Sequence, residues 1–178
     1  TDQELYDKII RRYENRKNNE KLFFMGITMQ NHGGYTETYD NFPENYYKVG
    51  RSYTDANQYL SLVHESDEAV KNLISYFSKV DDPVEIIFFG DHQPSLNSNF
   101  YPILNGKGLT GLTEDELEKL YTVPFFIWTN YDTPEETVDI TSLDYLSTMA
   151  LERAGIELPA YNKFLADMQE VVPAINSR

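Results

Sequence analysis

The clearest structural signal in the chain is Val84-Glu85-Ile86-Ile87-Phe88-Phe89-Gly90-Asp91-His92-Gln93-Pro94. Residues 84–89 form an apolar run of strand length, and the turn-forming residues Asp81-Asp82-Pro83 precede it. A glycine, a carboxylate and an imidazole follow the run directly. Because ligands of open parallel sheets bind outside the carboxyl ends of strands, this stretch predicts a strand with a candidate site at its end.

Two further apolar runs, 22–28 and 123–128, also have the length and composition of strands. Between 22–28 and 84–89, apolar residues recur at helical spacing over 54–77, after Thr54 as a candidate cap. A strand, a crossover helix and a strand of these lengths predict a right-handed parallel βαβ unit. We therefore expect an α/β fold with a mainly parallel sheet and flanking helices.

Four other segments are expected to be helical. The first begins at Asp2 as a cap and ends at Asn18-Asn19. The second is short and opens with a capping box made by Thr113 and Glu116. The other two run from Thr141 to a C-terminal cap at Gly155, and over 160–170. No repeat or linker divides them, so residues 1–178 are expected to belong to one domain.

The composition excludes several classes of protein. Apolar residues make up 40% of the chain, which is enough to form a core. A formal net charge of −14 argues against nucleic acid as a partner, since its backbone attracts basic proteins. The absence of cysteine excludes disulfides and thiolate sites. The start lacks Met and any signal-peptide core, so we expect an excised piece of a longer protein.

Two of the three histidines lie at predicted strand ends. His32 follows the run 22–28, and Asp91-His92 follows the run 84–89, where a tight turn at Gly90 can bring adjacent side chains together. From spacing alone, Asp91 could equally be a capping residue beside an unrelated His92. His32 could be a loop histidine bonded to backbone carbonyls. His64 lies within the predicted helix 54–77 and is most simply a packing or surface residue.

Three segments together carry a resemblance to a known family. They are Ile27-Thr28-Met29-Gln30-Asn31-His32-Gly33-Gly34-Tyr35, Ile86-Ile87-Phe88-Phe89-Gly90-Asp91-His92-Gln93-Pro94 and Val123-Pro124-Phe125-Phe126-Ile127-Trp128. In order and spacing they resemble the C-terminal part of lipoteichoic-acid-synthase-like phosphoglycerol transferases. These enzymes belong to the alkaline phosphatase and sulfatase superfamily. The resemblance covers nearly the whole chain.

The resemblance implies a partial sulfatase-like catalytic domain at the extracellular face of a bacterial cell membrane, with the parent protein anchored by N-terminal helices. The donor would be an anionic phospholipid headgroup, that of phosphatidylglycerol, and the acceptor a polymer or glycan. A threonine would carry the glycerophosphoryl group, beside a manganese or magnesium ion. Asp91 and His92 would be ligands of this divalent metal ion, and His32 would contact the substrate phosphate. Arg51 is another candidate contact, although it matches no family position.

The nucleophilic threonine and the first metal carboxylate of the family have no counterpart in this sequence. We therefore assign no catalytic nucleophile and expect the isolated chain to be inactive. Two alternatives to the transferase stay open. One is a sulfatase or phosphodiesterase of the same superfamily, and the other is a non-catalytic wall- or glycan-binding module, suggested by the tyrosine-rich loop 35–53.

Overall fold

The fold is described from a computed structural model that covers residues 1–36, 39, 41–42, 49 and 53–175. The chain divides into two compact units. The first unit consists of Thr1–Lys79 and Gly90–Pro124, and the second of Val80–Phe89 and Phe125–Arg178. Each unit is described separately. Candidate Arg51 lies outside the described residues.

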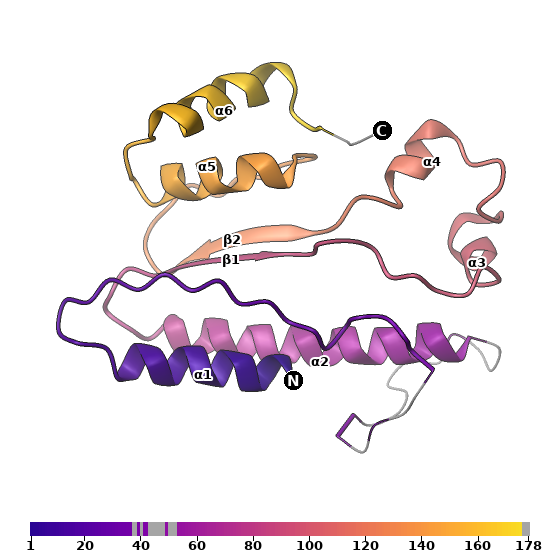
Figure 1. Cartoon of the computed structure of the whole chain (residues 1–178), viewed down its shortest axis with the longest axis horizontal. Coiled ribbons are helices and arrows are strands. Elements are labelled where there is room, and N and C mark those ends of the chain that lie inside the picture. Colours follow the sequence, from indigo (N-terminus) through magenta and orange to yellow (C-terminus); the bar gives the residue numbers. More distant parts are fainter. Residues whose placement is uncertain (37–38, 40, 43–48, 50–52, 176–178) are drawn as a thin grey trace. The chain divides into compact units, whose positions relative to one another are not determined.

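The first unit is built on two long helices that lie side by side, α1 (Asp2–Glu14) and α2 (Thr54–Phe77) (Figure 1). Thr1, and not Asp2, caps α1, because its side chain accepts a hydrogen bond from the backbone N–H of Glu4. The helices share a core of aromatic and aliphatic side chains: Tyr6, Ala56, Leu62, Ala69, Val70, Leu73 and Phe77. No helix in the described part of the chain is long and apolar enough to span a bilayer.

Two short helices complete the first unit, α3 (Tyr101–Asn105) and α4 (Glu114–Glu118). The capping box predicted for α4 is present, since Thr113 accepts from the N–H of Glu116 and the Glu116 side chain bonds the N–H of Thr113. Helix α3 was not predicted. It begins near Pro102 and ends at Gly106, which has a left-handed φ of 69°.

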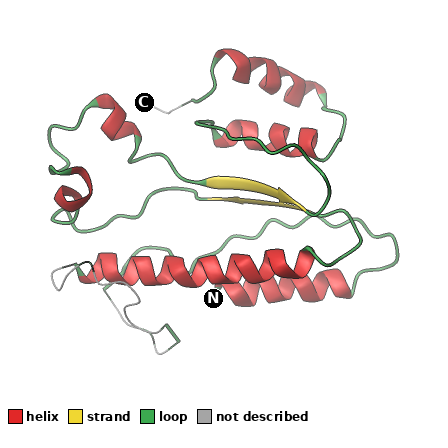
Figure 2. Ribbon diagram, turned by 180° about the vertical axis from the view of Figure 1, so that it is seen from behind, coloured by secondary structure: helices red, strands yellow, loops and turns green. Residues whose placement is uncertain are grey.

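The second unit contains two strands, β1 (Glu85–Phe89) and β2 (Phe125–Thr129), and two helices, α5 (Leu143–Arg153) and α6 (Ala160–Val171) (Figure 2). The rings of Phe88 and Phe126 stack across the strands, with centroids 5.3 Å apart. Helices α5 and α6 pack on each other around the buried Tyr145 and Thr148. The predicted cap Gly155 adopts a φ of 66° after α5.

The α/β class is confirmed, but the parallel order expected for the sheet is wrong for the two strands that form. Strands β1 and β2 pair antiparallel, with Phe89 opposite Phe125 and Glu85 opposite Thr129. The segment 90–124 leaves the end of β1 and returns to the same end, so β2 begins beside the point where β1 stops. A continuous apolar run indicates burial on both faces but carries no information on strand direction.

The strand predicted over 22–28 is also absent. This segment is extended without regular structure, and most of its apolar side chains are exposed, with Phe23 at 90% and Ile27 at 71%. A strand exists only when its backbone groups pair with a neighbour. None of the residues that the structure describes pairs with 22–28 as a strand, so its composition alone does not make it one.

Candidate functional site

The turn after β1 depends on a close approach of the backbone to Val123. Gly90 donates its N–H to the carbonyl of Pro124 at 3.2 Å. A Cβ at position 90 would lie 3.0 Å from Cβ of Val123 and 3.3 Å from its Cγ1. Only glycine leaves this space free, and the chain can therefore turn directly into Asp91 and His92.

Asp91 and His92 form an exposed pair held by local hydrogen bonds. The N–H of His92 donates to Oδ1 of Asp91 at 2.9 Å, and the imidazole Nε2 lies 3.6 Å from Oδ2 of the same carboxylate. The other ring nitrogen, Nδ1, lies 2.9 Å from the carbonyl of Gln93. Since a carbonyl only accepts, Nδ1 carries the proton in this bond, which leaves the lone pair on Nε2 in the neutral ring.

The carboxylate of Asp91 and Nε2 of His92 could serve as two ligands of a metal ion. A carboxylate oxygen and an imidazole Nε2 are both common ligands of divalent cations, and a hydrogen bond from Nδ1 to a carbonyl is the usual way to orient a ligating histidine. The side chain of Gln93 donates to the carbonyl of Thr122, which anchors the segment further. Within the described ranges, however, no group of three or more His, Asp or Glu side chains could hold a metal ion. The pair therefore fits part of a site.

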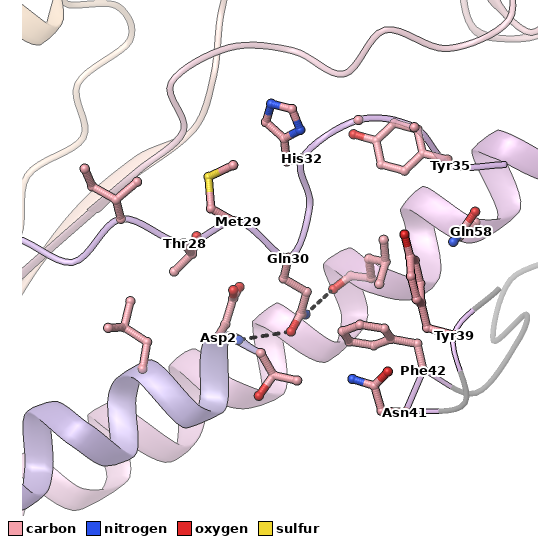
Figure 3. A pocket seen from close by; sticks show the side chains of 16 residues that line it. Asp2, Thr28, Met29, Gln30, His32, Tyr35, Tyr39, Asn41, Phe42 and Gln58 are labelled. Atoms are coloured by element: carbon pink, nitrogen blue, oxygen red, sulfur yellow. Dashed lines mark hydrogen bonds between the residues drawn. The ribbon is translucent and has the colours of Figure 1, made fainter. Parts of the chain in front are cut away.

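The segment 28–34, which contains the other candidate residue His32, is fixed to both long helices by Gln30. Its Oε1 accepts from the backbone N–H of Asp2 at 3.1 Å (Figure 3). Its Nε2 donates to the carbonyl of Leu62 at 3.2 Å and to Oγ of Ser66 at 3.1 Å. One amide side chain thus connects the start of α1 with the middle of α2.

Ser66 is the centre of a small polar network beneath this segment. Its hydroxyl accepts from Gln30 and from Nδ2 of Asn31 at 3.0 Å, and donates to Oδ2 of Asp2 at 2.6 Å. Asp2 is only 2% exposed, so this hydrogen bond satisfies a carboxylate in the interior. Among the described side chains, Oδ1 of Asn31 is the buried acceptor that has no hydrogen-bond partner. The network sets the path of the backbone that leads to His32.

His32 follows this network in a turn, where its N–H donates to the carbonyl of Met29 at 3.2 Å. Its side chain is exposed. Gly34 has a φ of 100°, and a Cβ added to Gly33 or Gly34 would meet nothing within 4 Å. The backbone beside His32 is therefore open to an approaching ligand.

His32 lies on a cleft of about 470 Å³, which we call the His32 cleft. Its lining comes from the start of α1, the segment 27–35, the described residues of the following loop, and α2: Thr1, Asp2, Leu5, Ile27, Thr28, Met29, Gln30, His32, Gly33, Gly34, Tyr35, Tyr39, Asn41, Phe42, Gln58 and Leu62. Asp91 and His92 are not among these residues. The structure thus keeps Asp91 and His92 together but does not bring them into the cleft with His32, and their joint role stays a prediction.

Sequence reasoning missed the network that holds His32. Ser66 lies at a buried position of α2, and a small hydroxyl residue among apolar neighbours was the signal for it. Gln30 and Asn31 were noticed only as neighbours of His32. The third histidine, His64, is half-buried within α2 and does not line the His32 cleft.

Comparisons with known proteins give a family match and two relatives. Residues 1–156 match the Sulfatase family. A Rhizobium meliloti (strain 1021) protein assigned to cyclic beta-1,2-glucan modification is 28% identical over an alignment of 178 residues, which covers 96% of this chain and 27% of that protein. The capsular polysaccharide biosynthesis protein RkpI of the same organism is 33% identical over 98 residues, or 55% of this chain and 16% of that protein.

A solved structure shows the same fold. It is the Streptococcus pyogenes phosphoglycerol transferase GacH in complex with sn-glycerol-1-phosphate, with a TM-score of 0.72 and 20% identity. The match covers 96% of this chain and 41% of that chain. The chain thus spans about a quarter of the length of its glucan-modification relative and less than half of GacH. From the family match over residues 1–156, this chain belongs to the Sulfatase family.

Proposed function

We propose that this chain is the part of a metal-dependent phosphoglycerol transferase that contributes Asp91 and His92 to a metal site and His32 to substrate binding. The observation that carries the proposal is the Asp91–His92 pair. Its carboxylate and its Nε2 lie 3.6 Å apart on an exposed turn, with Nδ1 already bonded to a carbonyl. The fold shared with GacH supports the same class of reaction.

The residues of this chain have distinct roles in the proposal. Asp91 supplies a hard oxygen ligand and His92 supplies Nε2. A manganese or magnesium ion, when bound there, would neutralise charge on phosphoryl oxygens and lower the pKa of a coordinated hydroxyl. His32 would donate a hydrogen bond to a phosphate or leaving oxygen. In a chain with a net charge of −14, such local donors are needed for an anionic headgroup to approach.

The substrates follow from the resemblance and the relatives. The donor would be phosphatidylglycerol at the extracellular face of a bacterial membrane, and a threonine with no counterpart in this chain would carry the glycerophosphoryl group. The acceptor would be a glycan, because one relative is assigned to glucan modification and another to capsular polysaccharide biosynthesis. The Sulfatase match also favours a hydrolase of the same superfamily as the second candidate.

The test is a transfer assay with the full-length protein that contains this chain. Vesicles with labelled phosphatidylglycerol and a neutral glucan should give labelled glucan, and EDTA should stop the reaction until manganese is restored. Asp91→Ala and His92→Ala should each reduce transfer at least 100-fold, as expected for a lost metal ligand. Asp81→Ala, at an exposed carboxylate, and His64→Ala, at a half-buried histidine outside the His32 cleft, serve as matched controls that should keep the activity.

The labelled products of this assay distinguish the transferase from the hydrolase and from the non-catalytic module. Labelled glycerol phosphate released equally with and without glucan would identify a hydrolase. Transfer that is insensitive to EDTA and to both variants would contradict the metal assignment. A protein that binds glucan but turns over neither donor nor ester would be the non-catalytic module.

A further inference from the structure

The His32 cleft has a lining that suits a neutral ligand. No Lys or Arg side chain occurs among the described residues that line it. The one carboxylate among these described lining residues, Asp2, is 2% exposed and already accepts from Ser66. Away from His32, an anionic ligand would lose its hydration without gaining a Lys or Arg side chain among these described residues. The charge balance therefore favours an uncharged molecule.

One wall of the cleft is aromatic. Tyr39 is 52% exposed, and its ring meets that of Phe42 edge to face, with centroids 6.4 Å apart. Tyr35 is buried, packs against Tyr59 at 5.4 Å and donates its hydroxyl to the carbonyl of Asn31 at 2.6 Å. Tyr35 is thus held in place, whereas Tyr39 offers a ring face with a polar tip to a ligand.

Polar groups that can both donate and accept also line the cleft. Asn41 and Gln58 supply amides on the side of Tyr39 and Phe42, and Thr28 supplies a hydroxyl away from these rings, beside Asp2 (Figure 3). Apolar rings next to a few amides and hydroxyls match a ligand with carbon–hydrogen faces and many hydroxyls at its edge. Sugar rings have this chemistry. The volume of about 470 Å³ lies within the range of small-molecule sites.

We propose that the His32 cleft binds neutral sugar rings of the glycan acceptor, with a ring packed on Tyr39 and its hydroxyls bonded to the amide of Asn41. That this glycan is the acceptor of the reaction rests on the proposed function, in which His32 on the same cleft contacts the phosphate that the glycan receives. Sugar binding itself requires neither metal nor the nucleophile. The two proposals can therefore fail separately.

The experiment is a titration of the full 178-residue chain in EDTA, followed by NMR. The probes are unsubstituted cyclic β-1,2-glucan and sn-glycerol-1-phosphate. The glucan should shift the signals of Tyr39 and Asn41 saturably in the millimolar range. Tyr39→Ala should weaken its binding about tenfold through loss of the packed ring. Tyr161→Ala, at a position of α6 that is 69% exposed, is the matched control and should bind as the unchanged chain does.

Three results would overturn the proposal. One is the absence of saturable shifts with glucan, and another is equal glucan affinity of the Tyr39→Ala variant and the unchanged chain. The third is tighter binding of sn-glycerol-1-phosphate than of glucan at the same signals, which would assign the cleft to the anionic headgroup. Because Tyr39 is exposed, its variant is expected to fold, and its amide spectrum checks this directly. If the 178-residue chain binds glucan but the full-length protein shows no transfer in the assay above, only the proposed function is contradicted.

Discussion

At the scale of single residues, small steric and electrostatic details set the candidate site. Gly90 leaves room for Val123, and Gln93 fixes the ring of His92. The sequence pointed to Gly90, Asp91 and His92 because a glycine and two ligand-type side chains follow an apolar run. It could not reveal the role of Val123, since contact between residues so far apart in sequence depends on how the chain returns after β1.

Replacing Gly90 tests this contact. In Gly90→Ala the new Cβ would overlap with Val123, so the turn must shift, and we expect a loss of about 1–3 kcal/mol in the free energy of unfolding. Gly108→Ala is the control, because a Cβ there meets nothing within 4 Å. Chemical denaturation measures both, and NMR of His92 reports the displacement. Equal stability of the two variants, with unchanged His92 signals, would show that Gly90 is not required.

A second residue-scale prediction concerns Glu85 in β1. Burial raises the pKa of Glu85, and a hydrogen bond from the Tyr131 hydroxyl at 3.1 Å opposes this increase. Tyr131→Phe should therefore raise the pKa of Glu85 further, which NMR titration of the Glu85 carboxyl would measure. A raised folded-state pKa means that the contribution of Glu85 to stability is present below its unfolded value of 4.5 and is lost as pH rises through the folded value.

The variant should therefore lose more stability than the unchanged chain as pH rises above 4.5. The tyrosine itself titrates far from this window, since burial beside Glu85 raises the pKa of Tyr131 to about 12. Denaturation of both proteins at a series of pH values measures the direction of this pH dependence. A lower pKa for Glu85 in the Tyr131→Phe variant would contradict the direction of the hydrogen-bond effect.

At the scale of elements, local signals predicted the helices better than the sheet. The capping box at Thr113 and the cap at Gly155 are both present, because capping depends on residues a few positions apart. The runs 84–89 and 123–128 became β1 and β2 within one or two residues at each end. The run 22–28 did not become a strand, because pairing requires a neighbour that its own composition cannot supply.

The connection between α1, α2 and the segment 28–34 gives the element-scale prediction. Ser66→Ala removes the donor to the buried Asp2 carboxylate and the acceptor for Gln30 and Asn31. An unsatisfied buried group costs about 1–3 kcal/mol, so the free energy of unfolding should fall by that amount. Ser75→Ala, on an exposed position of the same helix, is the control. Thermal unfolding measures both, and equal midpoints would show that Ser66 does not hold the network.

At the scale of the whole molecule, the chain carries one part of the family's fold. Its match covers 41% of GacH and 27% of the glucan-modification relative. The described residues supply Asp91 and His92 together but no third His, Asp or Glu that would complete a metal site with them. The family could be predicted from the motifs, because they are short and local. A complete metal site could not be predicted, because the described segments hold no third ligand-type side chain beside Asp91 and His92.

Metal affinity gives the last prediction. Two ligands on an exposed turn hold a divalent cation weakly, because water competes for the remaining positions and nothing fixes the coordination geometry. We therefore expect the 178-residue chain to bind manganese only at high micromolar to millimolar concentration and to show no metal-dependent turnover of phosphatidylglycerol. Paramagnetic broadening by manganese should affect the signals of Asp91 and His92 first, and Asp91→Ala combined with His92→Ala should abolish this local effect. The broadening should be unchanged in the control pair Asp81→Ala and His64→Ala. Tight manganese binding that survives loss of both Asp91 and His92 would place the metal elsewhere in the chain and refute the assignment.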